Sequence, residues 1–236
     1  MSDHWEPMIP YTYRDIAKLI DHSLLSPTLI ASDLETGCEL ARKYDVASVC
    51  IMPFALRKCA EILLGSGVKA STTVGFPHGG TTTAAKIAEA KQALADGGEE
   101  LDAVVNISWV RSGAWAEVRT EIQTLTELTH AAGQKIKIIF ENCYLNGDEK
   151  RRLCEICGEL RADWVKTSTG FGTGGATIED VQLMREHCPP WVQVKAAGGV
   201  RDLDKLLEMR ALGVTRVGAS KTIEILEEAK RRFESA

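Results

Sequence analysis

The chain has 236 residues, of which 44% are hydrophobic and 26% are charged, and its formal net charge is −5. This composition is typical of a soluble globular protein and excludes the disordered and fibrous classes, and the absence of a basic patch argues against a nucleic-acid partner. No apolar run approaches the roughly 20 residues that span a bilayer, and residues 1–10 lack the pattern of a secretory signal, so we expect no membrane partner.

Short runs rich in β-branched residues alternate along the chain with longer segments whose apolar residues recur at helical spacing. The first run is weak, and seven stronger ones follow it. We predict eight strands, at Lys18–Leu24, Val46–Ile51, Lys69–Phe76, Leu101–Ile107, Lys135–Glu141, Asp163–Thr167, Val192–Ala196 and Arg216–Ser220.

The segments between these strands carry signals for the starts and ends of helices. Short polar residues near the predicted helix starts are Asp33, Thr82, Thr177 and Asp202. Glycines near the predicted helix ends, where a left-handed backbone is common, are Gly97, Gly133 and Gly213.

Alternating strands and helices imply a parallel sheet, either a closed eight-stranded barrel or an open doubly wound sheet. Eight units of about 30 residues match the number and size expected of the barrel. No Gly-x-Gly-x-x-Gly fingerprint follows an early strand, as a dinucleotide-binding sheet would require. We predict an α/β fold: a single (β/α)8 TIM barrel with a short N-terminal helix, forming one domain over residues 1–236.

The seven cysteines are an odd number scattered through apolar contexts, which favours free thiols in a reducing compartment. Cys154 and Cys157 form a Cys-x-x-Cys pair, but no second pair is present to complete a zinc site. The pair lies in the helical run of residues 148–160, so helix packing is favoured over metal or redox use. We expect a cytoplasmic protein with no metal and no other cofactor.

Charged residues interrupt several strands that should be apolar because both faces of a parallel sheet are covered. They are Asp102, Lys137, Lys166 and Lys195. Alternation places Lys137 on the same face as Glu141, and Asp102 on the same face as Asn106. Each lysine alone could extend along the strand end to water. Two on successive strands indicate a function, since an isolated buried charge costs several kcal/mol.

Two neighbouring lysines can do what one cannot. An amine attacks a carbonyl only when it is neutral, and an ordinary lysine has a pKa near 10.4. A second ammonium group and an apolar pocket lower this pKa, by about 3 units in strong cases. The pair Lys166 and Lys195 therefore predicts a Schiff-base nucleophile and the cation that tunes it. Asp102 could then transfer protons while a carbon–carbon bond breaks, which is the chemistry of an aldolase.

Glycine and hydroxyl residues follow the last two strands. Gly198 and Gly199 follow the seventh strand, and Ser220 and Lys221 follow the eighth at the start of the last helix. In eight-stranded barrels these loops often hold a phosphate through backbone N–H groups. The alternative is that the glycines only make tight turns. The run Gly170–Gly175 suggests a further loop facing a phosphate.

Nearly the whole chain resembles the deoxyribose-phosphate aldolases, a family of class I aldolases. The most specific of the matching motifs is Val-Lys-Thr-Ser-Thr-Gly-Phe at residues 165–171. The motifs that carry the resemblance are Leu19–Thr28, Val49–Pro53, Val74–Gly79, Glu100–Asn106, Lys137–Glu141, Val165–Phe171, Gly174–Thr177, Val194–Arg201 and Arg216–Ser220.

The resemblance implies reversible cleavage of 2-deoxy-D-ribose 5-phosphate to D-glyceraldehyde 3-phosphate and acetaldehyde without a metal, as part of deoxyribonucleotide catabolism. It implies that Lys166 forms the Schiff base, that Lys195 lowers its pKa and that Asp102 is the acid–base group. The substrate-binding residues that it implies are Asp21, Lys137, Cys50, Gly198, Gly199 and Ser220. It also implies a homo-oligomer, either a dimer or a tetramer.

The sequence departs from the family pattern at Lys221 and Thr222, where a small or hydroxyl residue usually follows the serine, and at Ala197, which replaces a frequent serine. A related phosphorylated sugar therefore stays open as the substrate. Two other functions also stay open. One is a phosphosugar isomerase that uses Glu141 or Asp102 as a base, and the other is a barrel that only binds a sugar phosphate and signals its presence to a partner protein.

Overall fold

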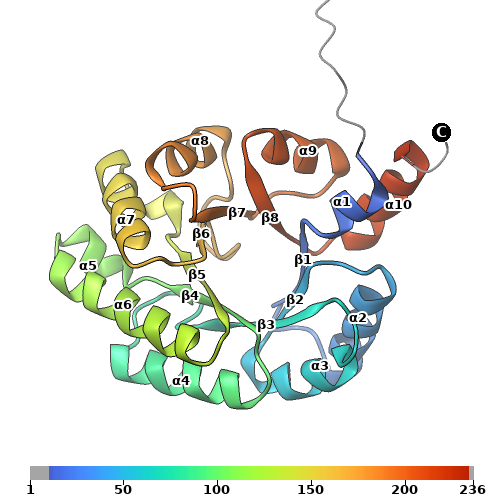
Figure 1. Ribbon diagram of the computed structural model, residues 1–236, viewed down its shortest axis with the longest axis horizontal. Helices are drawn as coiled ribbons and strands as arrows, with labels where there is room; N and C mark the ends of the chain where they lie inside the picture. The colour runs from blue at the N-terminus through green and yellow to red at the C-terminus, as the bar shows by residue number, and fades with distance from the viewer. Residues whose placement is uncertain (1–10, 234–236) are drawn as a thin grey trace, which may run out of the picture.

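The computed structural model describes residues 11–233, in which eight parallel strands form a closed barrel with the strands in sequence order and β8 paired to β1. Helices surround the strands (Figure 1). The strands are β1 (Ile20–Leu24), β2 (Ser48–Ile51), β3 (Lys69–Val74), β4 (Glu100–Val104), β5 (Lys135–Ile139), β6 (Trp164–Lys166), β7 (Gln193–Ala197) and β8 (Val214–Ala219). The predicted TIM barrel is confirmed. Residues 1–10, for which no signal sequence is expected, lie outside the described residues.

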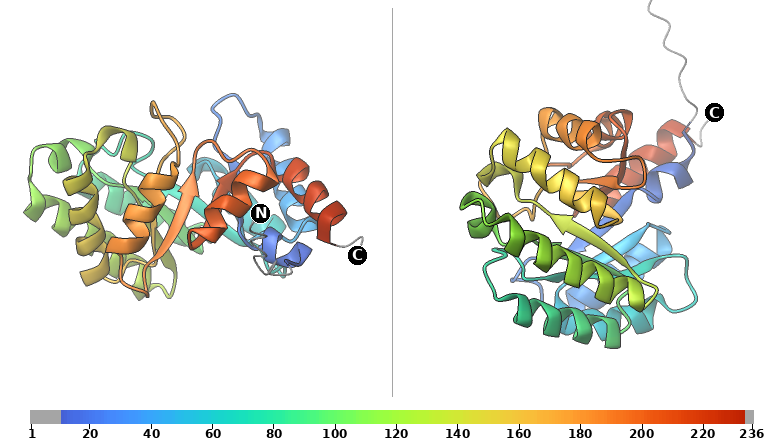
Figure 2. Two further views of the ribbon diagram at one scale, coloured as in Figure 1. Left: turned by 90° about the horizontal axis from the view of Figure 1, so that it is seen from above. Right: turned by 60° about the vertical axis from the view of Figure 1, so that its left-hand side comes forward.

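The short N-terminal helix that the sequence predicts is α1 (Tyr13–Ala17), and it packs against the last helix, α10 (Thr222–Phe233). Figure 2 shows the two helices side by side in both views. The remaining α-helices are α2 (Ala31–Lys43), α3 (Leu56–Leu63), α4 (Thr83–Ala95), α5 (Ile107–Arg111), α6 (Trp115–Ala131), α7 (Gly147–Glu159), α8 (Ile178–His187) and α9 (Leu203–Ala211). Two 3-10 turns, η1 (Pro53–Ala55) and η2 (Asn142–Tyr144), follow β2 and β5. No helix in residues 11–233 is both long and apolar enough to cross a membrane.

The predicted signals mark the helix ends. The side chains of Thr82, Thr177 and Asp202 accept hydrogen bonds from the first turns of α4, α8 and α9. Asp33 lies inside the first turn of α2, where its carboxylate accepts a hydrogen bond from the Ile30 amide. The three predicted helix-end glycines, Gly97, Gly133 and Gly213, all have positive φ.

Three predicted strands, the third, fourth and fifth, run two or three residues past the C-terminal end of the observed strand. The third ends at Val74 rather than at Phe76. The fourth strand ends at Val104, and Asn106 caps α5 through a hydrogen bond from the Trp109 amide to Oδ1. The fifth strand ends at Ile139, and Glu141 has a left-handed backbone with φ of 56°. Alternation therefore does not place Glu141 on the face of Lys137, or Asn106 on that of Asp102.

A buried ion pair supports the end of β4 from outside the barrel. Lys86 of α4 donates to the Val104 carbonyl at 2.7 Å and to Glu121 Oε1 of α6 at 2.8 Å. Glu121 Oε1 also accepts a hydrogen bond from the Asn106 amide. Both charged side chains are almost completely buried. The pair satisfies the backbone where the chain leaves β4 and turns into α5.

Replacing Lys86 with Met should lower the free energy of unfolding by about 3 to 5 kcal/mol, because the Glu121 carboxylate would stay buried without its cation. The control is Lys69→Met, which breaks an exposed pair with Glu99 at 2.6 Å and should cost about 1 kcal/mol or less. Urea unfolding of both variants measures the difference. Equal losses of unfolding free energy in the two variants would show that the buried pair stabilises the fold no more than the exposed pair does.

Candidate active site

The interior of the barrel holds a group of seven charged side chains, called here the charge cluster. Its acidic members come from β1 and β4 and its basic members from β5 to β8, and Arg216, at 14% exposure, is the most accessible of the side chains. The members are Asp21, Glu100, Asp102, Lys137, Lys166, Lys195 and Arg216. Parallel pairing sets Lys166 opposite Lys195 and Asp102 opposite Lys137, which places these charges at similar levels of the barrel.

Asp102 lies at the centre of the charge cluster. Its Oδ1 accepts a hydrogen bond from Lys137 Nζ at 2.9 Å. Its Oδ2 accepts one from Lys166 Nζ at 2.8 Å and one from Lys195 Nζ at 2.8 Å. Because the last two lysines share one oxygen atom, their nitrogens lie within twice that distance of each other. The structure thus brings together the two lysines and the aspartate that the sequence selects.

The two lysines have pKa values displaced in opposite directions. Burial lowers the pKa of Lys166, the Lys195 ammonium lowers it further, and the Asp102 carboxylate offsets only part of the change. Burial also acts on Lys195, but Asp102 and Asp21 together raise its pKa above the ordinary value. Lys195 also contacts Asp21 Oδ2 at 2.5 Å. Lys166 is therefore the amine that loses its proton more readily, and Lys195 stays charged.

The aspartate stays ionised despite its burial. Burial by itself would raise the pKa of Asp102, but the ammonium groups of Lys137, Lys166 and Lys195 hold it well below the usual range. A carboxylate in this state is a strong hydrogen-bond acceptor and a weak base.

The surroundings differ from the apolar pocket that the sequence predicts. Two members of the charge cluster, Glu100 and Arg216, were missed. Arg216 donates to both carboxylate oxygens of Glu100, at 2.8 and 3.0 Å, and to Asp21 Oδ1 at 2.7 Å. Sequence signals for both existed, since Glu100 lies two residues before Asp102 and Arg216 two residues before Gly218, each on the same face of its strand.

Glu141, in contrast, lies away from the charge cluster. Its carboxylate accepts hydrogen bonds from the Thr169 amide and hydroxyl, and it lines a small separate pocket with His78 and Tyr144. The left-handed backbone at Glu141 turns the chain out of the barrel. A base at this position has no contact with Lys166.

A pocket of about 470 Å³ opens over Lys166 at the ends of β6, β7 and β8. Three of the predicted phosphate-binding residues, Gly198, Gly199 and Ser220, line it together with Arg201, which the sequence analysis did not select. Gly198 and Gly199 have φ of 82° and 90°, a conformation that favours glycine. A Cβ on Gly198 would lie 2.8 Å from Gly175 Cα, so glycine also permits this loop contact.

The residues that depart from the family pattern beside Ser220 do not enter this pocket. Lys221 Nζ pairs with Glu224 Oε1 at 2.9 Å on the exposed face of α10. The Thr222 hydroxyl lies 2.8 Å from Nδ1 of His22, a buried ring whose pKa is lowered by burial to about 4. His22 is therefore neutral at physiological pH, and Thr222 holds β1 to the last helix.

Cys50 of β2 is buried, with its Sγ 3.9 Å from Asp102 Oδ2. Burial raises the pKa of this thiol, and the nearby Asp102 charge adds to the effect. The residue contacts the charge cluster as a neutral thiol. Among residues 11–233, no group of three or more His, Cys, Asp or Glu side chains could hold a metal ion.

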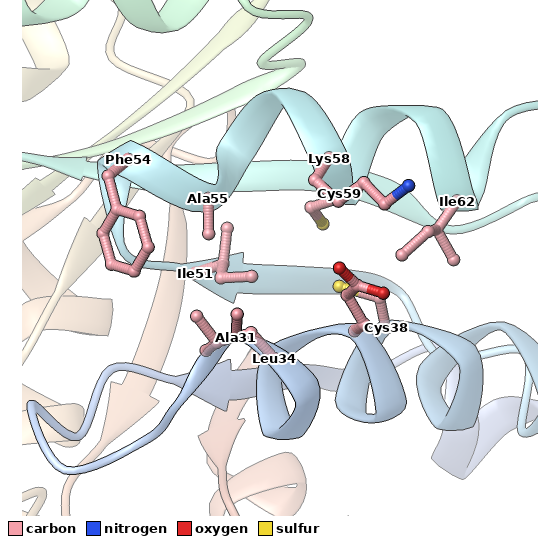
Figure 3. A pocket seen from close by; sticks show the side chains of 10 residues that line it. Ala31, Leu34, Cys38, Ile51, Phe54, Ala55, Lys58, Cys59 and Ile62 are labelled. Carbon is pink, nitrogen blue, oxygen red and sulfur yellow. The ribbon is translucent and has the colours of Figure 1, made fainter.

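Another pocket, of about 150 Å³, lies outside the barrel between α2, β2 and α3 (Figure 3). Its walls are mainly apolar, with Leu34, Ile51 and Phe54 among them, and Cys38 and Cys59 contribute two thiols. Lys58 is the lysine among its lining residues, and it is exposed. This pocket therefore lacks the buried, paired lysine that lines the pocket over Lys166.

The sequence and the fold both have relatives among aldolases. The model of the DeoC/LacD family aldolases matches residues 16–220. The deoxyribose-phosphate aldolase of Rhodopirellula baltica is 65% identical over 96% of this chain and 94% of its own length, and that of Thermococcus gammatolerans is 43% identical over 92% and 97%. The solved tetrameric deoxyribose phosphate aldolase of Aeropyrum pernix superimposes with a TM-score of 0.86 at 28% identity, over 93% of this chain and 92% of that one. With its barrel, its charge cluster and these matches, the chain belongs to the DeoC/LacD family of aldolases.

Proposed function

We propose that the protein is a class I aldolase that reversibly cleaves 2-deoxy-D-ribose 5-phosphate to D-glyceraldehyde 3-phosphate and acetaldehyde. The observation that carries the proposal is the shared Asp102 oxygen: it holds two buried lysines together, and only Lys166 of the two lines the open pocket. The relatives named deoxyribose-phosphate aldolase support the choice of sugar.

Lys166 is the nucleophile in this proposal. Its neutral Nζ attacks the aldehyde carbon of the open-chain sugar to give a carbinolamine, and loss of water gives an iminium ion. Removal of the proton from the sugar C3 hydroxyl then breaks the C2–C3 bond. The electron pair moves into the iminium, which becomes an enamine, and glyceraldehyde 3-phosphate leaves. Protonation of the enamine carbon and hydrolysis release acetaldehyde and the free amine.

Lys195 and Asp102 transfer protons during the reaction. Asp102 Oδ2 is within hydrogen-bond distance of both nitrogens, so it can pass a proton between Lys195 and the nitrogen of the reacting intermediate, directly or through water. Lys195 keeps its charge and disfavours a second charge on Lys166.

The remaining members of the predicted site serve as supports. Asp21 and Lys137 bind Lys195 and Asp102 and fix their positions, at 2.5 and 2.9 Å respectively. Cys50 lies against Asp102 as a neutral group.

In this proposal the sugar phosphate binds at the loops after β7 and β8. The backbone amides of Gly198 and Gly199 and the hydroxyl of Ser220 would donate to the phosphate oxygens, and Arg201 adds a positive charge. All four residues share one pocket with Lys166, which suits a substrate whose two ends carry an aldehyde and a phosphate.

The isomerase alternative is disfavoured by the charges. An isomerase needs a carboxylate base with a pKa nearer to neutral, whereas three ammonium groups hold the pKa of Asp102 low. Glu141 is bound to Thr169 and does not line the pocket over Lys166. A barrel that only binds a sugar phosphate would have no use for an amine of lowered pKa.

We further propose that residues 1–236 act as one domain, in a cytoplasmic homo-oligomer that is a dimer or a tetramer. Large apolar side chains that a partner subunit could cover include Phe54 at 75% exposure and Leu64 at 81%. The tetrameric relative from Aeropyrum pernix supports assembly. The buried free cysteines suit a reducing compartment.

Cyanoborohydride added with acetaldehyde should reduce the Schiff base and leave a stable ethyl adduct on Lys166, which peptide mass spectrometry locates. The variant Lys166→Arg should lose the adduct and at least about a thousandfold of its activity, because a guanidinium is not a nucleophile at neutral pH. An adduct on a different lysine, or substantial turnover by Lys166→Arg, would contradict the proposed function.

Replacing Lys195 with Leu should raise the pKa of Lys166, because the neighbouring positive charge is gone while Asp102 remains. The free amine is the active form, so the acid limb of the pH dependence of kcat/KM should move to higher pH by about one unit or more. The control Lys221→Leu removes an exposed lysine and should leave the limb in place. A Lys195→Leu enzyme with an unchanged limb would show that Lys195 does not tune Lys166.

The variant Ser220→Ala should raise KM for the phosphorylated sugar by about tenfold while changing kcat little, because a hydrogen bond to a charged group is worth about 1.5 to 3 kcal/mol. Lys221→Ala should leave KM unchanged, since Lys221 pairs with Glu224 outside the pocket. Steady-state kinetics of both variants give the comparison. A larger rise of KM in Lys221→Ala than in Ser220→Ala would indicate that the phosphate binds beside α10 rather than in the pocket.

A further inference from the structure

The charge cluster contains unequal numbers of charges. Its basic members are Lys137, Lys166, Lys195 and Arg216, and its acidic members are Asp21, Glu100 and Asp102. Four cations face three anions when every group is ionised. The cluster is balanced when one of the four basic groups is neutral, and burial makes a balanced cluster the favoured state because an uncompensated charge is costly there.

The contacts decide which basic group gives up its proton. Lys137 contacts all three carboxylates, at 2.5 Å from Glu100, 2.9 Å from Asp102 and 3.6 Å from Asp21. Lys195 contacts Asp21 and Asp102. Lys166 contacts Asp102 and shares that oxygen with Lys195. Lys166 has the fewest contacts with carboxylates. Removing its proton therefore loses less electrostatic attraction than removing one from Lys137 or Lys195.

Arg216 and Glu100 enter this balance without lining the substrate pocket. Arg216 is a guanidinium that does not lose its proton in proteins, and it donates to Glu100 and to Asp21 Oδ1. It also lies 5.0 Å from the centre of the Trp164 ring, which adds a cation–π contact. The arginine therefore contributes one permanent positive charge, and Glu100 contributes one of the three negative charges.

We propose that Glu100 and Arg216 are positioning residues that fix the net charge of the cluster and thereby keep Lys166 neutral. This inference rests on the proposed function, in which Lys166 acts as a free amine. The ionisable groups nearest to Lys166 are Asp102 of β4, Lys195 of β7 and Cys50 of β2. His22 of β1 and Arg201, after β7, line the same pocket. Lys137 acts on Lys166 through Asp102, and Glu100 and Arg216 act on it through Asp21 and Lys137.

The proposal makes opposite predictions for the two residues. In Arg216→Gln the cluster has three cations and three anions with Lys166 protonated, so protonation is favoured and the pKa of Lys166 rises. In Glu100→Gln four cations face two anions, so Lys166 is deprotonated more readily and its pKa falls. The double variant restores an excess of one cation, and its Lys166 should titrate like that of the wild type.

The experiment measures the initial rate of adduct formation on Lys166 with acetaldehyde and cyanoborohydride as a function of pH, from about pH 5 to pH 9. The midpoint of this rate follows the free amine of Lys166. The midpoint should move up by about one pH unit in Arg216→Gln, down by about one unit in Glu100→Gln, and return in the double variant. Shifts in the same direction, or none, would overturn the inference.

Charge-conserving variants separate charge from shape. Arg216→Lys and Glu100→Asp keep the charge count and should leave the midpoint near that of the wild type even where the rate falls. If Arg216→Lys moves the midpoint as far as Arg216→Gln does, the inference is wrong. Circular dichroism and thermal unfolding verify that each variant is folded, and the charge-conserving pair decides the question if a glutamine variant does not fold. Absence of any adduct on Lys166 in the wild type would instead refute the proposed function.

Discussion

One carboxylate, Asp102, holds the amino groups of two lysines at a single oxygen inside a closed barrel, and the chemistry of the site depends on that contact. Moving an ion out of water costs several kcal/mol even after the protein relaxes. The charge cluster is tolerated because each of its carboxylates contacts at least two basic side chains, and Asp21 and Asp102 contact three each. Without Asp102, Lys166 and Lys195 would have no common partner and would repel each other in a medium that screens charge poorly.

Closure of the sheet brings the members of the charge cluster into contact. β7 and β1 are not neighbours in the sheet, yet Lys195 reaches Asp21 at 2.5 Å because β8 pairs with both strands. In an open sheet of the same strand order, β1 would lie at an edge far from β7. The same closure gathers the loops after β6, β7 and β8 at one end, so Lys166 and the residues proposed to bind the phosphate share a pocket.

The sequence predicts the strands and the central charges because both depend on local patterns. Lys166 and Lys195 stand out as charges within apolar runs, and alternation gives their face. Glu100 and Arg216 were overlooked because Glu100 precedes the predicted fourth strand and Arg216 is the first residue of the predicted eighth strand, where a charge normally reaches water. Glu141 was placed on the wrong face because a left-handed backbone at that residue breaks the alternation, and strand periodicity carries no information beyond the strand end.

A buried lysine is not by itself evidence of amine chemistry in this fold. Lys86 is as deeply buried as Lys166, but one carboxylate, that of Glu121, balances its charge, and a backbone carbonyl takes a second hydrogen bond. Burial lowers the pKa of both lysines, so burial does not distinguish them. The difference is that Lys166 shares its carboxylate with another lysine and lines an open pocket, whereas Lys86 is enclosed between α4, β4 and α6. Competition for a counter-ion, together with access for a substrate, separates a reactive amine from a structural one.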